Sequence, residues 1–242
     1  MLSQFSRSEL LLGKEGMDKL KNSRVAVFGV GGVGGYVCEA LVRTGIGAFD
    51  LIDSDTVSLT NLNRQIIATQ KTVGQYKVDV MKERMLDINP EVEVRVHKCF
   101  FLPENADQFP FKEYDYVVDA VDTVTAKIEL VIKCQKEGVP IISSMGAGNK
   151  FEASTFRVAD IYKTSMCPLA KVMRRELKNR GVKKLKVVYS EEKPFSPEYA
   201  DDEWEKKGER PAPGSLAFVP SAAGLIIAGE VVKDLTGKKG SF

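Results

Sequence analysis

A glycine-rich segment near the N-terminus restricts the possible folds of this chain more than any other feature. The run from Gly29 to Gly35 follows a short apolar stretch, residues 24–28, and leads into a helical pattern that Gly45 ends. A buried strand that passes through glycines into a helix begins many nucleotide-binding folds, because glycine allows a tight turn and a close approach to phosphate. We therefore expect a Rossmann-like domain at the start of the chain. The candidate phosphate-binding residues are Gly29, Gly31, Gly32 and Gly34.

The hydrophobic pattern around and beyond the glycines alternates between strand and helix. Further strands are predicted at residues 49–53, 92–96, 116–121 and 140–143, and helices at 1–20, 32–44, 73–88 and 125–137. Short apolar strands that alternate with amphipathic helices favour a parallel sheet covered on both faces. This part of the chain therefore predicts a doubly wound α/β fold with a mainly parallel sheet.

The second half of the chain is less regular. Strands are predicted at 154–158 and 185–189, helices at 169–180 and 221–235, and a long acidic, proline-rich surface loop at 190–215. A chain of 242 residues fits one large domain, and no internal repeat divides it. We expect a single domain over 1–242, with a nucleotide-binding part over about 1–150 and a substrate-facing part over about 151–242.

The composition excludes several kinds of chemistry. His97 is the only histidine, so a site built on several imidazoles is impossible. The residue lies in an alternating run and is expected to be a partly exposed strand residue. No apolar run is long enough to span a membrane or to act as an export signal, so we expect a cytoplasmic protein.

The four cysteines are widely spaced, and no two of them form a C-x-x-C pair. A four-cysteine zinc site normally uses such pairs, so we expect no zinc and four reduced thiols. Cys38, Cys99 and Cys134 fall within strand or helix patterns and are expected in the core. For Cys167, burial as a small apolar residue is favoured over a reactive thiol.

The residues after the second predicted strand indicate which nucleotide the domain binds. Asp53 ends that strand, where a carboxylate can accept hydrogen bonds from ribose hydroxyls. Arg64 and Lys77 then supply two cations, which a dinucleotide does not need but a reacting triphosphate does. Asp122 follows the fourth strand and suits Mg²⁺, whereas Asp119 is alternatively a polar residue that points inward. We therefore expect ATP and Mg²⁺.

Four motifs together resemble the adenylating superfamily of ubiquitin-activating-enzyme-like proteins. They are GVGGVGG at 29–35, DSDTVSLTNLNRQ at 53–65, VGQYK at 73–77 and VVDAVDT at 117–123. The resemblance implies ATP-dependent transfer of AMP to a substrate carboxylate, with release of pyrophosphate. It also implies that Asp53 binds ribose, that Asp122 directs Mg²⁺, and that Arg64 and Lys77 are the catalytic cations. The further nucleotide-binding residues that it implies are Asp55, Asn61 and Gln65.

The same resemblance implies a homodimer, in which Arg7 reaches the ATP of the partner subunit. From the sequence alone, Arg7 is an ordinary surface residue of the first predicted helix. The resemblance leaves open whether a monovalent cation binds, whether a sulfur-transfer partner takes part, and whether the last helix touches a membrane.

Two departures from the superfamily narrow the expected substrate. The chain lacks the C-x-x-C zinc ligands of the sulfur-carrier activators, and segment 190–215 lacks the thioester-forming cysteine of the ubiquitin-type enzymes. Residues 163–194 and 214–235 look instead like those of the tRNA threonylcarbamoyladenosine dehydratases. That resemblance implies adenylation of the threonine carboxylate of a modified adenosine in tRNA, and then internal attack that closes a ring with net loss of water. An activator of a carrier protein ending in Gly-Gly is the alternative. A nucleotide-binding subunit without turnover and an NAD-dependent oxidoreductase are less favoured.

A basic segment supports a nucleic-acid partner. Between positions 171 and 186 there are eight cationic residues and a single acidic one, Glu176. The acidic residues of 191–209 offset this charge, so the net charge of +2 conceals two opposite patches. Cations that contact phosphates would give salt-dependent tRNA binding, and a solvated helix face is the alternative. The eight residues are Lys171, Arg174, Arg175, Lys178, Arg180, Lys183, Lys184 and Lys186.

Overall fold

The computed structural model describes residues 3–196 and 213–238, and most of the predicted acidic loop lies outside them. The strands are β1 (Arg24–Phe28), β2 (Ala48–Ile52), β3 (Glu93–His97), β4 (Tyr116–Asp119), β5 (Ile141–Ser144), β6 (Phe156–Asp160) and β7 (Lys186–Ser190). The α-helices are α1 (Ser6–Lys21), α2 (Gly34–Thr44), α3 (Lys77–Ile88), α4 (Val124–Glu137), α5 (Pro168–Asn179) and α6 (Phe218–Thr236). None of these helices is long and apolar enough to cross a membrane.

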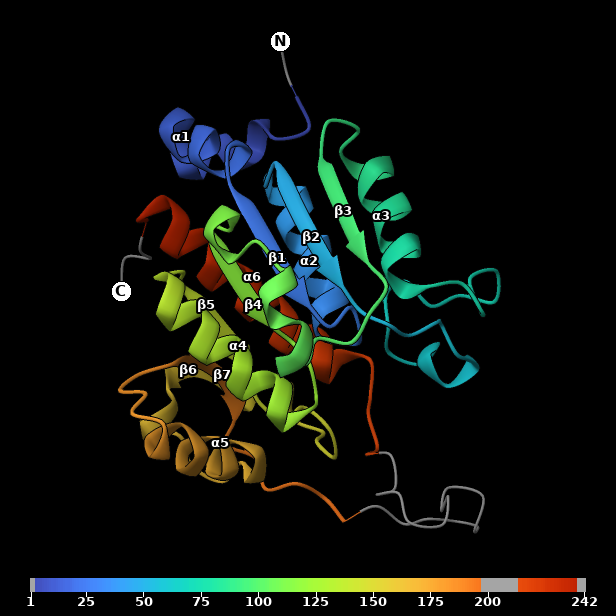
Figure 1. Cartoon of the computed structure of the whole chain (residues 1–242). Coiled ribbons are helices and arrows are strands. Elements are labelled where there is room, and N and C mark those ends of the chain that lie inside the picture. The colour runs from blue at the N-terminus through green and yellow to red at the C-terminus, as the bar shows by residue number, and fades with distance from the viewer. Residues whose placement is uncertain (1–2, 197–212, 239–242) are drawn as a thin grey trace.

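The strands form one seven-stranded sheet in the order β3-β2-β1-β4-β5-β7-β6 (Figure 1). All neighbours are parallel except β6 and β7, which are antiparallel. The predicted doubly wound, mainly parallel α/β fold is therefore confirmed. In the register, Phe28 lies opposite both Ile52 and Asp119, so β1, β2 and β4 end at nearly the same level. Because the strand order reverses between β1 and β4, the loops that follow these two strands meet at a topological switch point.

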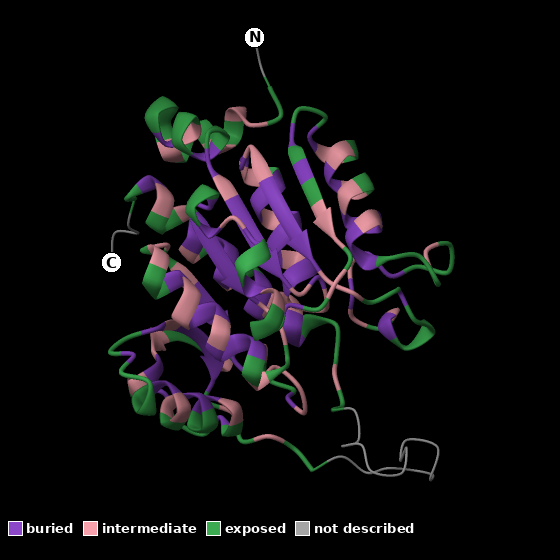
Figure 2. Ribbon diagram, viewed as in Figure 1, coloured by how far each residue is buried: buried purple, intermediate pink, exposed green. Residues whose placement is uncertain are grey.

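Helices cover both faces of the sheet and bury its central strands (Figure 2). On one face α2, α3 and α6 pack with the C-terminal end of α1 around the largest apolar cluster. On the other face α4 packs with the short 3₁₀ turns η2 (Pro103–Gln108) and η3 (Phe111–Glu113), while α5 packs beside α4 over β7. The central strands are apolar on both faces because both faces are covered.

Several predicted boundaries differ from the structure, and three helices show how. The helix predicted at 73–88 begins only at Lys77, because Gly74 and Gln75 are held by backbone hydrogen bonds to Val57. The first helix begins at Ser6 and bends at Gly13, whose φ of 71° interrupts its helical dihedrals. The last helix begins at 218 rather than 221. The start of α3 thus depends on a contact with Val57, which is distant in the sequence, and the local residue pattern does not predict it.

A buried polar cluster links the first three strands. Asp50 of β2 is fully buried and accepts hydrogen bonds from Arg24 Nη1 (2.9 Å) and Tyr114 Oη (3.2 Å). His97 Nε2 lies 2.9 Å from the same carboxylate and acts as a donor, because an ionised carboxylate can only accept. His97 is a partly exposed strand residue, as predicted. The cluster is structural, since it lies below the loops at the carboxyl ends of the strands.

Acidification should weaken the fold through Asp50. Burial raises the pKa of this carboxyl group, but hydrogen bonds from His97 and Arg24 outweigh burial and hold the pKa below its ordinary value. Such a group stabilises the fold above its unfolded pKa of about 3.9, and that stabilisation is lost as the pH falls through the folded pKa. When the pH is lowered below about 4, we expect the urea concentration at the unfolding midpoint of the wild type to decrease. The midpoint of Asp50→Asn should decrease less steeply over the same pH range. An Asp50→Asn variant as stable as the wild type at pH 7 would contradict this role, because breaking a buried ion pair costs about 3–5 kcal/mol.

Candidate active site

A cavity of about 380 Å³ lies at the carboxyl ends of β1, β2 and β4. It collects residues from segments that are far apart in the sequence, from the glycine loop near position 29 to Pro220 in α6, as expected at a switch point of an open α/β sheet. All sequence-predicted site residues except Gly34 and Arg7 line it. These are Gly29, Gly31, Gly32, Asp53, Asp55, Asn61, Arg64, Gln65, Lys77 and Asp122.

The glycine loop is shaped by close backbone packing. Gly29 has a φ of 89°, and a Cβ atom there would lie 2.7 Å from the carbonyl oxygen of Ala120. A Cβ atom on Gly34 would lie only 1.8 Å from the carbonyl oxygen of Gly29. Gly34 therefore closes the loop onto itself and does not line the cavity. Its contact with the nucleotide stays a prediction beside this packing role.

Asp53 is fixed at the base of the glycine loop. Its Oδ2 accepts a hydrogen bond from the backbone N–H of Val30 at 2.7 Å, and its Oδ1 accepts one from that of Asp55 at 2.9 Å. Each carboxylate oxygen can accept a second hydrogen bond. The side chain can therefore hold the loop and still accept hydrogen bonds from a ligand's hydroxyl groups.

Lys77 is the first residue of α3, and its side chain is almost fully buried in the cavity wall. Its Nζ lies 2.7 Å from Oδ2 of Asp55, and its backbone N–H donates to the carbonyl oxygen of Asp55 at 3.0 Å. These two contacts fix the ammonium group at the edge of the cavity. Asp55 is half exposed, so an entering phosphate can compete with it for the same cation.

Arg64 supplies the second cation. Its Nη1 donates to the carbonyl oxygen of Thr60 and to Oδ1 of Asn63, both at 2.9 Å. Burial lowers the pKa of the guanidinium group, which stays far above neutrality and therefore charged. Arg64 is thus a planar cation held by neutral groups, and this arrangement suits a phosphate ligand.

Two buried oxygen atoms in the cavity wall point to a polar ligand. Among the described residues, Gln65 Oε1 and Ser54 Oγ are buried and have no hydrogen-bond partner. A buried polar atom without a partner costs about 1–3 kcal/mol, so native proteins rarely keep one unless something binds there. The cavity therefore carries unsatisfied polar atoms as well as cations.

Asp122 lies on the exposed loop between β4 and α4 and faces the cavity. Its Oδ1 accepts only a long hydrogen bond, 3.3 Å, from Thr123 Oγ1. Mg²⁺ on a nucleotide commonly takes one or two protein carboxylates and completes its shell with phosphate oxygens and water. No group of three His, Cys, Asp or Glu side chains suited to a metal comes together within 3–196 and 213–238. The donor set at Asp122 therefore fits a metal held jointly with a nucleotide.

An ion pair beneath this loop was missed from the sequence. Lys127 and Asp119 are fully buried, and Lys127 Nζ lies 3.0 Å from both carboxylate oxygens and 2.7 Å from the carbonyl oxygen of Ser144. Asp119 Oδ1 also accepts the backbone N–H of Val121 at 3.3 Å. The pair thus supports the loop that carries Asp122. A lysine in the first turn of a helix is unfavourable because it opposes the helix dipole. Such a lysine in the sequence could have indicated that Lys127 has a buried acidic partner.

The cysteines fit the expectations with one exception. Cys38 and Cys134 are buried, and burial raises the pKa of both thiols. Cys167 is a buried residue at the start of α5, packed in the apolar cluster there. Cys99 was expected in the core, but β3 already ends at His97. Cys99 therefore lies in the following loop, partly exposed, and lines the cavity.

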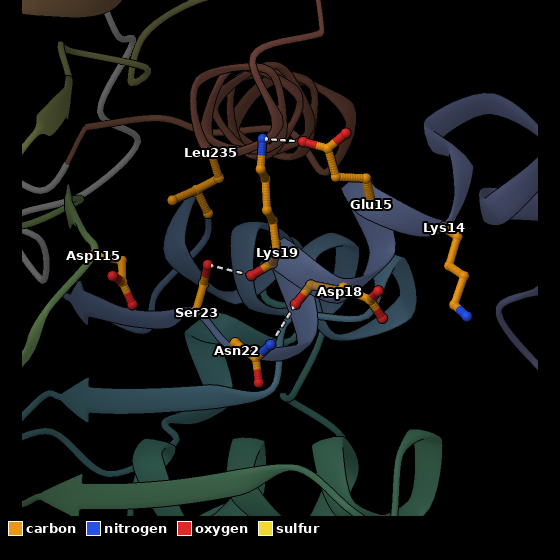
Figure 3. A pocket seen from close by; sticks show the side chains of 8 residues that line it. All are labelled: Lys14, Glu15, Asp18, Lys19, Asn22, Ser23, Asp115 and Leu235. Atoms are coloured by element: carbon orange, nitrogen blue, oxygen red, sulfur yellow. Dashed lines mark hydrogen bonds and ion pairs between the residues drawn. The ribbon is translucent and has the colours of Figure 1, made fainter.

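A second hollow lies at the opposite end of the sheet, where β1 begins (Figure 3). Several of its polar side chains already have partners within α1 and the turn after it: Lys19 pairs with Glu15 at 3.0 Å, and Asn22 donates to the backbone carbonyl oxygen of Asp18. Ligands of open α/β sheets bind at the carboxyl ends of the strands instead. This hollow is therefore not the active site. Its lining consists of Lys14, Glu15, Asp18, Lys19, Asn22, Ser23, Asp115 and Leu235.

Arg7 is exposed on α1 and does not line the cavity of its own chain. Figure 1 shows α1 at the end of the sheet where β1 begins, whereas the glycine loop follows the other end of that strand. Arg7 can therefore contribute to a nucleotide site only if it reaches the site of another chain.

The predicted basic surface is smaller than the sequence indicated. Lys171, Arg175 and Lys178 of α5 are exposed. Lys186, however, lies in β7 and pairs with Glu230 (3.2 Å) and Asp234 (2.8 Å) of α6, so it does not belong to this surface. Arg174 is partly buried and donates to the carbonyl oxygen of Thr164. The period of α5 turns Arg174 toward the protein and the other three cations of the helix toward solvent, whereas Lys186 belongs to a strand.

The sequence matches the ThiF family over residues 5–242. It is 50% identical to a tRNA threonylcarbamoyladenosine dehydratase of Bacillus subtilis (strain 168), over 97% of this chain and 95% of that one. A protein of the same name from Escherichia coli (strain K12) is 40% identical over 73% of this chain and 66% of its own length. The crystal structure of E. coli tRNA N6-threonylcarbamoyladenosine dehydratase, TcdA, in complex with ATP is similar with a TM-score of 0.88, at 34% identity, over 97% of this chain and 94% of that one.

Proposed function

The chain belongs to the ThiF family, and from this premise we propose that it is an ATP-dependent dehydratase of N6-threonylcarbamoyladenosine in tRNA. The observation that carries the proposal is the 50% identity to the B. subtilis protein over nearly the full length of both chains. This identity extends beyond the nucleotide-binding part, about 1–150, into the part that we expect to face the substrate. A single sheet takes strands from both parts, and this supports one adenylating domain over 1–242.

ATP is the nucleotide of the cavity. The E. coli relative was solved with ATP and with AMP, the two ends of an adenylation reaction. In this chain Lys77 and Arg64 bring two cations to the lining of one cavity, which suits phosphates better than the neutral nicotinamide half of a dinucleotide. We assign the ribose hydroxyls to Asp53, and the phosphate oxygens to Arg64, Lys77, Asn61 and the glycine loop.

The first step is attack of the threonine carboxylate on the α-phosphate, with pyrophosphate as the leaving group. Negative charge builds up on the phosphates, and fixed cations lower the barrier because they need no reorganisation during the reaction. Arg64 and Lys77 are such cations, since both are held in place before a ligand enters. Asp122 is the residue that would hold Mg²⁺, which neutralises further phosphate charge when it is bound.

The second step closes the ring. A carboxylate is a poor electrophile, whereas an acyl-adenylate offers AMP as a good leaving group. A nucleophile within the same substrate then attacks the acyl carbon, and one carboxylate oxygen departs with AMP. The net change in the RNA is the loss of one water, while ATP becomes AMP and pyrophosphate. The enzyme needs no thiol for this chemistry, in agreement with the buried position of Cys167.

The test is a reaction with ATP, Mg²⁺ and a tRNA that carries the modified adenosine. We expect pyrophosphate exchange and loss of one water from the RNA only with the modified tRNA. Exchange with a carrier protein ending in Gly-Gly would favour the alternative of a carrier-protein activator. ATP binding without turnover on either substrate would indicate a non-catalytic subunit.

A homodimer completes the proposed site. Leu10 and Leu11 of α1 are 86% and 81% exposed, and they lie one helical turn from Arg7 on the same face. Burying a large apolar side chain contributes about 1.5–3 kcal/mol, and this free energy is not gained while the two leucines are in water. Contact with a second copy of the chain would bury them. We propose that this face of α1 docks on the partner subunit and brings Arg7 to its ATP.

Mixing two inactive variants tests this arrangement. Arg7→Ala and Asp122→Ala should each be nearly inactive alone, because each removes a charge from every site of its own homodimer. In a mixed dimer, the Arg7→Ala protomer keeps Asp122 and receives Arg7 from its partner, so one site is intact. Random mixing should therefore restore about a quarter of the wild-type rate. A mixture that stays as inactive as its components would contradict the contribution of Arg7 from the partner.

A further inference from the structure

Two exposed phenylalanine rings lie together on the surface. Phe151, in the loop between β5 and β6, is 62% exposed, and Phe218, the first residue of α6, is 49% exposed. Their ring centroids are 5.8 Å apart, and the ring planes meet at 83°, an edge-to-face arrangement. Such a pair leaves one face of the receiving ring open. Isolated exposed apolar residues are common, but two aromatic rings held together in water usually mark a contact surface.

The two rings lie at the rim of the nucleotide cavity. Gly148 lines the cavity and precedes Phe151 in the same short loop. Ser215 and Pro220 also line the cavity, on either side of Phe218 in the chain. Both segments that carry the rings therefore also form the cavity wall.

Hydrogen bonds fix both segments. The backbone N–H of Phe151 donates to the carboxylate of Glu192 at 3.0 Å. Asn149 joins the two sides of the rim: its backbone N–H donates to the carbonyl oxygen of Gly214 at 2.7 Å, and its Oδ1 accepts the N–H of Gly214 at 2.6 Å. Hydrogen bonds therefore hold the backbone that carries both rings. When a planar ligand stacks on the rings, little binding free energy is spent on ordering these segments.

The chemistry of the substrate indicates what these rings contact, and this step rests on the proposed function. The reacting carboxylate is joined to its adenine by a short threonylcarbamoyl group. When the carboxylate reaches the α-phosphate inside the cavity, the adenine and its neighbours must therefore lie at the rim. Bases of single-stranded RNA loops are commonly bound by stacking on aromatic side chains.

We propose that Phe151 and Phe218 form a stacking platform for a nucleobase of the substrate RNA loop. The base is either the modified adenine or the base next to it, and both would use the same ring face. The platform contributes to RNA binding and leaves ATP binding unchanged, since neither ring is part of the cavity lining.

The test compares single variants by steady-state kinetics on an anticodon stem-loop that carries the modified adenosine. Phe151→Leu and Phe218→Leu keep an apolar side chain but remove the ring, and each should raise KM for the RNA about tenfold to a hundredfold. Phe151→Tyr and Phe218→Tyr should stay close to the wild type. Affinity for ATP, the urea midpoint and the oligomeric state should not change in any of them. Leu225→Ala, which removes a 52% exposed side chain from the same helix, is the matched control and should behave like the wild type.

The outcomes separate the two possible bases and the two proposals. A similar rise in KM for the free modified nucleoside assigns the platform to the target adenine, and a rise for the stem-loop alone assigns it to a neighbour. Leucine variants with an unchanged KM for RNA overturn the platform. The platform is also overturned if the leucine variants and Leu225→Ala all convert the protein to monomers, because the rings then belong to an interface between copies of the chain. A wild type that does not turn over the modified stem-loop refutes the proposed function instead.

Discussion

Replacing Asp122 with alanine should slow adenylation about a thousandfold or more and leave the fold intact. The loss of activity is expected because Asp122 is the exposed carboxylate that faces the cavity from the end of β4, where it fits a metal bound to the phosphates. The fold should survive because the side chain makes only the long hydrogen bond to Thr123. A surface substitution of this kind changes the free energy of unfolding by about 0.5 kcal/mol or less.

The measurement is ATP–pyrophosphate exchange over a range of Mg²⁺ concentrations, beside urea unfolding of the same samples. Asp107→Ala is the matched control, because Asp107 is an exposed aspartate that pairs with Lys133 and does not line the cavity. We expect the control to retain the wild-type rate and Mg²⁺ dependence. Near-normal exchange by Asp122→Ala would remove the metal assignment. A large drop in the urea midpoint of that variant would show that its inactivity reflects unfolding.

Replacing Lys127 with methionine should lower the free energy of unfolding by about 3–5 kcal/mol. The change leaves the carboxylate of Asp119 buried without its cation, and also removes the hydrogen bond to the carbonyl oxygen of Ser144. A buried charge without a partner costs far more than the net contribution of an intact pair. Adding Asp119→Asn to this variant removes the unpaired charge and should recover a large part of the loss.

Urea unfolding of the two variants, with Lys136→Met as the control, tests this account. Lys136 is an exposed lysine on the same helix, so its replacement should leave the urea midpoint nearly unchanged. If Lys127→Met were as stable as the control, the ion pair would not support the fold. If the double variant were no more stable than Lys127→Met, the cost would come from lost packing and not from an unpaired charge.

The central part of the fold could be predicted because it is encoded locally. Each strand of the switch point is a short apolar run, and β1 is followed directly by its glycine loop. A residue at a fixed place after such a strand, such as Asp53 or Asp122, must lie at the carboxyl edge of the sheet, so its neighbourhood follows from the topology.

Other features depend on partners that are distant in the sequence. In the sequence, Lys186 belongs to a basic run, but its acidic partners lie more than forty residues away on α6. The packing role of Gly34 depends on the backbone of Gly29 coming within contact distance, and no pattern of residue types records that distance. The pairing of Phe151 with Phe218 joins two segments that only the folded chain brings together.

The tight packing of the glycine loop has a consequence for the thermodynamics of nucleotide binding. The backbone of Gly29 is enclosed by Ala120 on one side and by Gly34 on the other, so the protein's own atoms impose the shape of the loop. A nucleotide therefore does not have to order this segment, and little conformational entropy is lost there on binding. The free energy of the phosphate contacts then remains available for affinity. The conformational entropy of the glycine loop is already lost when the chain folds, before any nucleotide binds.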